Sequence, residues 1–332
     1  MMKALVLDGI GKPLLMKEVP APSLLPGEAL VRIKAAAFNR RDWWIQRGQY
    51  AGLKYPIVLG SDGAGVVEAV ADAGDEEWLN RDVLINPSLG WELDSEAQPA
   101  GFSILGLPQD GTFAEYVRVP VINLYRKPAH LSFEEAAALP LGGLTAYRAL
   151  FRKANLAAGE KVLITGIGGG VATFALQWAV HAGAEVYVSS SSPTKIEQAV
   201  AAGAVGGVDY RDPDWASKLK EWSGGLDVII DSALGDGFAH FLELANVGGR
   251  IVFFGGTSGN LPPLDGRRIF WNQLQIKGTS MGSKVDFENM LDFLVNHQIK
   301  PLVDSIIPWE SAEEGLEKMT ASTQFGKIVL QM

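Results

Sequence analysis

The segment from Lys161 to Lys195, KVLITGIGGGVATFALQWAVHAGAEVYVSSSSPTK, decides the fold. A short apolar run leads into a glycine cluster at 166–170, and an apolar segment able to form a helix follows. A second apolar run then ends in four serines at 189–192. A strand, a glycine-rich turn and a helix in this order are typical of the first unit of a parallel sheet that binds a dinucleotide.

The glycine turn has a specific physical requirement. At this place in a parallel sheet, backbone N–H groups and a helix N-terminus point toward a diphosphate, and only glycine lets the phosphates come close. We expect Gly169 and Gly170 to be the close-approach positions, and Val171 to open the helix within the same cofactor-binding segment. Ala172 takes the position where the helix must pack tightly on the strand. A glycine cluster standing alone is also compatible with a tight turn that binds nothing.

The rest of this region supports the first interpretation. Five further apolar runs follow, at 185–190, 206–210, 226–233, 249–256 and 274–280, and segments able to form helices separate them. Six strands with five crossovers describe a doubly wound parallel sheet, which makes the chain an α/β protein. In that context a dinucleotide site is favoured over an empty turn.

The flanking regions have a different pattern. Residues 1–125 alternate short apolar runs with Gly- and Pro-rich turns, which predicts a mostly β unit. Residues 132–154 favour helix, with Ser132 and Glu135 able to form a capping box, and 286–297 form a second amphipathic helix. The tail supplies strand, helix and strand, and is expected to return to the first unit. The predicted domains are therefore 1–126 with 283–332, and 127–282.

Composition limits the partners. The chain has 332 residues, of which 47% are hydrophobic and 20% charged, as in a soluble globular protein of two domains. A net charge of -9 disfavours nucleic acid and anionic membranes as partners. No apolar run reaches the roughly 18 residues of a membrane span, and the N-terminus lacks the apolar core of a signal peptide. We therefore expect a cytoplasmic protein that acts on a small molecule.

The four serines bear on the choice of cofactor. A protein that binds NAD usually places an acidic residue about 20 residues after the glycine turn, where it accepts from the ribose 2′-hydroxyl. Here that place holds serines, and Lys195 follows. Hydroxyls from Ser190 and Ser191 with the Lys195 ammonium would accommodate a 2′-phosphate, so the pattern favours NADPH over NADH. Ser192 followed by Pro193 is also a good helix cap, and both roles are compatible.

The order of motifs along nearly the whole chain resembles the medium-chain dehydrogenase/reductase superfamily, in its zinc-independent quinone-oxidoreductase-like branch. The resemblance is carried by AAAFNRRDWW (35–44), GSDGAGVV (60–67), GTFAEYVRVP (111–120), LPLGGLTAYRAL (139–150), GGVDYRD (206–212), GGLDVIIDSA (224–233), GGRIVFFGGTSG (248–259), FGKIVL (325–330) and the glycine turn. It implies a GroES-like β domain formed by both chain ends, an inserted Rossmann domain, and a homodimer or homotetramer.

The resemblance also implies further cofactor contacts. Thr145 and the pair Gly255 and Gly256 would lie near the nicotinamide, and Tyr210 would help to hold the adenosine phosphate. Lys327 resembles a tail lysine that approaches the cofactor in some relatives, and an exposed turn lysine is the alternative.

The metal ligands of zinc-dependent relatives are missing from this sequence. The corresponding positions resemble Asn39, Ser61 with Asp62, and Leu141, and the chain contains no cysteine. The four histidines, at 130, 181, 240 and 297, lie far apart without the paired spacing of metal ligands. We therefore expect no catalytic or structural zinc.

Without a metal, little would stabilise an alkoxide, so oxidation of a simple alcohol becomes difficult. Hydride addition to a quinone or enone instead produces a delocalised anion that a few hydrogen-bond donors can stabilise. By resemblance, Asn39 would bind the substrate or nicotinamide region, Asp42 would orient its segment, and Tyr50 would donate a hydrogen bond or the proton. Water is the alternative proton source. Trp44 stands where relatives often carry a second tyrosine.

Each of these residues also has a structural interpretation. Asn39 could cap a turn, Asp42 could cap a helix and pair with Arg41, and Tyr50 could simply pack. Several aromatic residues are candidates for either an apolar substrate cleft or the core: Trp43, Trp44, Trp91, Phe102, Phe270 and Trp271. Residues 90–106 are predicted to form a loop over that cleft.

The sequence thus predicts an NADPH-dependent reductase of quinones, enones or other electrophilic carbonyls. The alternatives are an alcohol dehydrogenase, an enoyl-thioester reductase, and a nicotinamide-binding sensor with little turnover.

Overall fold

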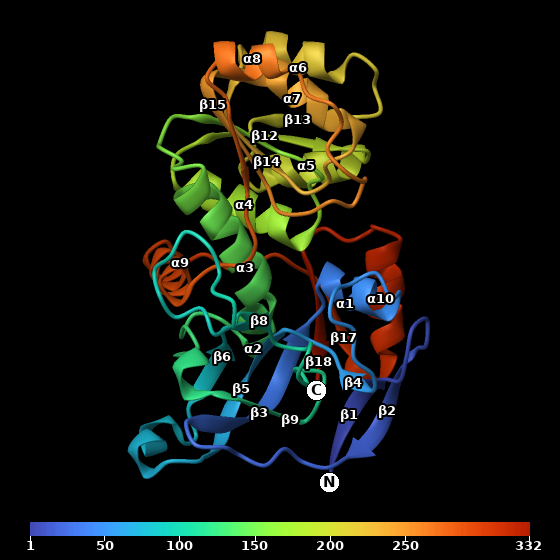
Figure 1. The fold of residues 1–332 in the computed structure, drawn as a ribbon, viewed down its shortest axis with the longest axis vertical. Helices are drawn as coiled ribbons and strands as arrows, with labels where there is room; N and C mark the ends of the chain where they lie inside the picture. Colours follow the sequence, from blue (N-terminus) through green and yellow to red (C-terminus); the bar gives the residue numbers. More distant parts are fainter. The chain divides into compact units, whose positions relative to one another are not determined.

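A computed structural model describes all 332 residues and divides into two compact units (Figure 1). The first unit comprises Met1–Leu144 and Gly282–Met332, and the second comprises Thr145–Met281. None of the helices combines the length and apolar character needed to cross a bilayer.

The first unit is built mainly from β-strands, as predicted. Its strands are β1 (Met2–Leu7), β2 (Leu14–Val19), β3 (Glu28–Ala37), β4 (Ile57–Val58), β5 (Asp62–Val70), β6 (Asp82–Ile85), β7 (Ser88–Leu89), β8 (Ser103–Ile104), β9 (Tyr116–Pro120), β10 (Leu124–Arg126), β17 (Val303–Pro308) and β18 (Lys327–Gln331). Its helices are α1 (Arg40–Gln46), α2 (Phe133–Ala138), α9 (Lys284–Asn296) and α10 (Ala312–Thr320), and α3 (Pro140–Tyr147) leads into the second unit.

The main sheet of this unit has the strand order β10-β6-β5-β3-β18-β17, and β9 also pairs with β3. The tail therefore returns to the first unit, as predicted, because β18 pairs antiparallel with β3. In β3, side chains alternate between buried and half-buried positions until the last three alanines, which are all buried. That alternation is the period-2 pattern of a strand with one face on the core.

Two helices of the first unit, α1 and α10, contact each other. α10 lies beside α1 (Figure 1), and Gln46 Nε2 on α1 donates to Glu313 Oε1 on α10 at 3.2 Å. The predicted helix at 132–154 begins with the expected capping box, in which Ser132 and Glu135 bond reciprocally. It is interrupted at Pro140, which starts α3, because proline has no backbone N–H to continue the first helix.

The first predicted domain boundary, at 126/127, comes too early by 18 residues, since the first unit runs to Leu144. The reason is tertiary: α2 packs against β3 and β5 of the first unit. The second boundary, predicted at 282/283, differs by one residue from the start of the returning segment at Gly282.

The second unit contains one six-stranded sheet of order β13-β12-β11-β14-β15-β16, in which all neighbours are parallel. The strands are β11 (Lys161–Ile164), β12 (Glu185–Ser190), β13 (Gly206–Asp209), β14 (Leu226–Asp231), β15 (Ala245–Phe253) and β16 (Gln275–Gly278). The helices are α4 (Gly170–His181), α5 (Pro193–Ala201), α6 (Trp215–Ser223), α7 (Phe241–Leu244) and α8 (Gly266–Trp271).

Each predicted strand segment of this unit overlaps one of the six strands, so the doubly wound sheet is confirmed. Leu163, Ile229 and Ile251 are register partners on three adjacent strands and are at most 1% exposed. Burying each such side chain stabilises the fold by about 1.5–3 kcal/mol relative to leaving it exposed. The strand order reverses between β11 and β14, which places a topological switch point at the end of β11.

Candidate cofactor and catalytic sites

The glycine turn follows β11 at this switch point. Gly166 and Gly168 have φ angles of +60° and +119°, which L-residues with a side chain rarely adopt. Gly169 is the N-cap of α4, and a Cβ built on it would meet no atom closer than Gly166 O at 3.9 Å. The space beside Gly169 is therefore left open, whereas a Cβ on Gly166 would lie 3.2 Å from Ser232 Oγ. An open cradle at the N-terminus of a 12-residue helix fits a diphosphate.

The helix that follows has the expected packing. It begins at Gly170, with Val171 half-buried in its first turn. Ala172 is 3% exposed, in keeping with the close helix–strand contact predicted for it. The turn itself is tied to the next strand, because Ile167 N donates to Ser189 O at 3.0 Å.

A buried hydrogen-bond network supports the turn, and sequence reasoning missed it. Thr165 Oγ1 donates to Asp231 Oδ1 at 2.6 Å, which links the carboxyl ends of β11 and β14. The other carboxylate oxygen of Asp231 accepts from Leu234 N at 2.7 Å. Burial raises the pKa of Asp231, while the hydrogen bond from Thr165 opposes that rise. The sequence signal that could have revealed this network is Asp231 itself, an acidic residue at the end of the apolar run in LDVIIDSA.

The serine cluster lies at the carboxyl end of β12. Ser192 is the N-cap of α5 with Pro193 in the first turn, as the sequence predicted. Ser190 is 4% exposed, and its hydroxyl oxygen accepts from Ser192 N at 3.1 Å, so this side chain is less free than expected. Its hydroxyl proton is still a donor. Ser191 and Lys195 are partly exposed at the same helix start.

The neighbouring strand adds a charged pair to this end of the sheet. Ser190 is the register partner of Asp209, the last residue of β13. Arg211 binds the Asp209 carboxylate with Nη2 at 2.6 Å, and this hydrogen bond lowers the pKa of Asp209. Tyr210 between them is 47% exposed, and its N–H bonds Ser190 O. Sequence reasoning selected Tyr210 and missed Arg211.

Three other predicted cofactor positions occupy the expected elements. Thr145 is 5% exposed on α3. Gly255 and Gly256 follow β15, and a Cβ on Gly255 would lie 2.6 Å from Ser232 O. Only glycine fits that close contact between two backbone segments.

In the first unit, three segments far apart in sequence meet in a buried polar cluster. Lys327 Nζ donates to Asn39 Oδ1 at 2.8 Å and to Asp62 Oδ2 at 2.9 Å. Asn39 Nδ2 also donates to Asp62 Oδ2 at 2.9 Å, and Leu141 N donates to Asp62 Oδ1 at 2.8 Å. Lys327 is thus neither an exposed turn lysine nor a lone tail cation, because its side chain is 3% exposed and paired with a fully buried carboxylate.

This cluster occupies the positions that resemble the zinc ligands of relatives. The groups in it that could ligate a metal are one carboxylate and one amide oxygen, and the lysine ammonium already donates a hydrogen bond to each of them. No group of three or more His, Cys, Asp or Glu side chains anywhere in the chain is arranged to hold a metal ion. A zinc site needs about four N, S or O ligands free of competing cations. The residues present do not fit a zinc ion.

Asp42 lies three residues after Asn39, in the first turn of α1, and is fully buried. Its Oδ2 accepts from Asn39 N at 2.8 Å, which satisfies a free amide at the start of α1. Burial raises the pKa of Asp42 to about 6, although the Arg41 charge opposes the rise. Asp42 therefore orients the Asn39 segment and caps the helix at the same time.

Arg41 turns toward a different set of partners. Its Nη1 donates to Ser61 Oγ at 2.6 Å and to Leu105 O at 2.8 Å, and its Nε donates to the Tyr50 hydroxyl at 3.4 Å. The guanidinium carbon also lies 5.1 Å from the centre of the Tyr50 ring. The half-buried Tyr50 hydroxyl therefore accepts from Arg41 and keeps its own proton for donation.

The aromatic residues predicted to line a cleft or the core differ widely in how exposed they are. Trp91 is 2% exposed and packs edge-on against Phe102, with ring centres 5.4 Å apart. Phe270 and Trp271, at the end of α8, are 68% and 77% exposed. Residues 90–106 form a loop closed by the β7–β8 pair.

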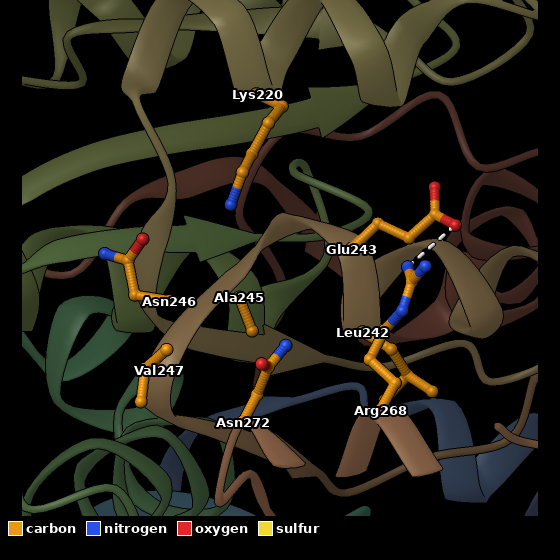
Figure 2. A pocket seen from close by; sticks show the side chains of 8 residues that line it. All are labelled: Lys220, Leu242, Glu243, Ala245, Asn246, Val247, Arg268 and Asn272. Carbon is orange, nitrogen blue, oxygen red and sulfur yellow. Dashed lines mark ion pairs between the residues drawn. The ribbon is translucent and has the colours of Figure 1, made fainter. Parts of the chain in front are cut away.

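A surface pocket in the second unit is separate from the glycine turn. Figure 2 shows its lining by Lys220 on α6, Ala245 at the start of β15, and Arg268 on α8, which pairs with Glu243 at 2.8 Å. The glycine turn follows β11 at the edge of the sheet formed by the carboxyl ends of the strands. The amino ends, including the start of β15, lie at the opposite edge. None of the predicted cofactor residues lines this pocket.

Comparison with known proteins identifies relatives of both units. The family "Alcohol dehydrogenase GroES-like domain" matches residues 25–129, and the family "Zinc-binding dehydrogenase" matches residues 170–296. The zinc-type alcohol dehydrogenase-like protein YogA of Leptosphaeria maculans is 34% identical, over 96% of this chain and 95% of its own. The synaptic vesicle membrane protein VAT-1 homolog of Homo sapiens is 27% identical, over 99% of this chain and 86% of its own. A crystal structure of an NAD-dependent alcohol dehydrogenase superposes with a TM-score of 0.91, at 36% identity and full coverage of both chains.

Proposed function

Because this chain belongs to the medium-chain dehydrogenase/reductase superfamily, and is thus an oxidoreductase that uses a nicotinamide cofactor, we propose a specific reaction for it. The protein transfers hydride from NADPH to a quinone, an enone or another conjugated carbonyl, without a metal ion. The observation that carries this proposal is the Asn39–Asp62–Lys327 cluster, in which an ammonium stands among the positions that bear metal ligands in zinc-dependent relatives.

The chemistry of the acceptor follows from the groups available. NADPH, when bound, supplies the hydride. Hydride addition to a conjugated carbonyl places negative charge on an oxygen, and hydrogen-bond donors stabilise that charge. Asn39 Nδ2 has a second hydrogen beyond the one given to Asp62, and the Tyr50 hydroxyl keeps its proton. We propose that Asn39 binds the developing oxyanion and that Tyr50 supplies the proton.

The preference for NADPH is supported by the end of β12. No acidic residue stands between Ser189 and Lys195 to bind a ribose 2′-hydroxyl. Asp209, on the adjacent strand, is already bound by Arg211. Hydroxyls and cations at this edge suit a 2′-phosphate.

A panel of acceptors tests the proposal. Purified protein is mixed with NADPH or NADH and with quinones, enones, aldehydes and an enoyl thioester, and nicotinamide absorbance is followed with and without a chelator. We expect turnover with conjugated acceptors that the chelator leaves unchanged. Strong oxidation of simple alcohols with NADP, or activity lost to the chelator, contradicts the proposal. Tight NADPH binding without turnover on any acceptor identifies a sensor.

The Lys195→Ala variant tests the cofactor preference directly. We expect the KM for NADPH to rise about tenfold or more while the KM for NADH changes little, since an ammonium–phosphate contact is lost only with NADPH. Lys218→Ala, which removes an exposed lysine paired with Asp212 on the same unit, is the matched control. Equal effects on both cofactors would remove Lys195 from phosphate recognition.

A further inference from the structure

The Lys327 ammonium is enclosed by three oxygen atoms. Its Nζ donates to Phe38 O and Asn39 Oδ1, both at 2.8 Å, and to Asp62 Oδ2 at 2.9 Å. A lysine ammonium has three N–H donors, so each one is used. With a side chain 3% exposed, Lys327 fills a cage suited to a cation and has no donor left for a ligand.

This cage fixes the orientation of the Asn39 amide. Oδ1 must face the donor Lys327, and Nδ2 must face the acceptor Asp62 Oδ2 at 2.9 Å. The flipped amide would place an N–H against the ammonium and an oxygen against the carboxylate. One orientation is therefore strongly favoured, and it leaves the second Nδ2 hydrogen in a defined direction.

Further hydrogen bonds fix the Asp62 carboxylate and its backbone. Leu141 N donates to Asp62 Oδ1 at 2.8 Å, and Thr112 Oγ1 donates to the Asp62 backbone oxygen at 2.7 Å. Asp62 is therefore a fixed counter-ion, and Lys327 brings the charge of the cluster to neutrality. A buried charge without such a partner would be strongly destabilising.

We infer that Lys327 is a positioning residue: its ammonium serves as a permanent, covalently attached cation that holds the Asn39 amide as a preorganised donor for the acceptor oxygen. The inference rests on the proposed function, because it assigns Lys327 a role in that reaction. Donors fixed before the reaction need no reorganisation when charge develops, which is the source of their catalytic benefit. Lys327 acts through Asn39 and does not touch the substrate.

Chemical rescue of Lys327→Ala tests this inference. The substitution removes three carbons and the ammonium, which propylammonium chloride can supply again. We expect kcat to fall about tenfold or more with a smaller change in KM, and added propylammonium to restore kcat with a saturable dependence. Propylammonium should also raise the unfolding temperature of the variant. Tetramethylammonium at equal concentration should do neither, because it has no N–H to donate.

The matched control is Lys127→Ala. Lys127 Nζ donates to the backbone oxygen of Leu131 at 2.7 Å in the same unit, and no ion pair joins it to a carboxylate. Its variant should show no response to propylammonium in kcat or in unfolding temperature. Identical responses in both variants, or equal effects of the two ammonium salts, would overturn the inference.

The double variant Lys327→Met/Asp62→Asn covers the case in which the single variant does not fold. It removes both charges, so no unpaired ion is left buried. A merely structural ion pair predicts that the double variant recovers the wild-type kcat. The positioning role predicts a folded protein with an unchanged Kd for NADPH and a kcat still reduced about tenfold or more. If the wild type turns over no acceptor, the proposed function fails, whereas the cage itself is still judged by the effect of propylammonium on the unfolding temperature.

Discussion

Replacing Asp42 with asparagine should change how the stability of this protein depends on pH. Asp42 is fully buried, and burial raises its pKa from 3.8 to about 6. The folded state therefore holds the proton more tightly than the unfolded state. The stabilisation from this group is fully present below pH 3.8 and is lost as the pH rises through about 6.

The magnitude follows from the two pKa values. The difference between 3.8 and about 6 corresponds to about 3 kcal/mol in the free energy of unfolding. Asparagine at this position keeps an oxygen that can accept from Asn39 N, so the cap survives while the ionisable group is gone. Relative to Asp42→Asn, the wild type should lose up to about 3 kcal/mol between pH 4 and pH 7.

Denaturant unfolding of both proteins across this pH range measures the effect. The decisive quantity is the difference between the two unfolding free energies at each pH. Asp304→Asn is a control of opposite sign, because the Lys318 ammonium and a backbone N–H lower the pKa of Asp304 overall even though burial opposes them. A difference between wild type and Asp42→Asn that stays constant with pH would refute the reasoning.

Two further substitutions examine the cofactor and the proton donor. Gly169→Val should weaken NADPH binding about tenfold or more by calorimetry while leaving the circular dichroism spectrum unchanged, since its side chain would fill the open cradle; undiminished binding would place the diphosphate elsewhere. Tyr50→Phe should lower kcat about tenfold or more in steady-state assays if the hydroxyl delivers the proton, as proposed; an unchanged kcat would identify water as the donor.

Local patterns were sufficient to predict the second unit. The strands β11, β12 and β14 each contain a short apolar run, and the glycine cluster that follows β11 marked the turn in which Gly166 and Gly168 adopt positive φ angles. The cap formed by Ser192 was equally local. The first domain boundary was misplaced because the packing of α2 on β3 and β5 involves residues remote in sequence.

The buried polar cluster of the first unit was only partly predictable. Asn39 and Asp42 were selected by resemblance, and the structure brings both into one buried network with Asp62. The contact between Lys327 and Asp62 could not be inferred, since the two residues lie 265 positions apart and a single lysine before an apolar run looks like an ordinary strand start. Likewise, no local signal separated the buried Trp91 from the exposed Trp271.

The place of β18 has a consequence for the biogenesis of the protein. Lys327 is carried by a strand that joins the sheet beside β3, nearly 300 residues after that strand is made. A nascent chain still attached to the ribosome therefore holds Asp62 without its counter-ion until the last strand emerges. A chain that ended before β18 would lack this ammonium even if it kept the whole second unit, and the buried Asp62 carboxylate would be left without its counter-ion.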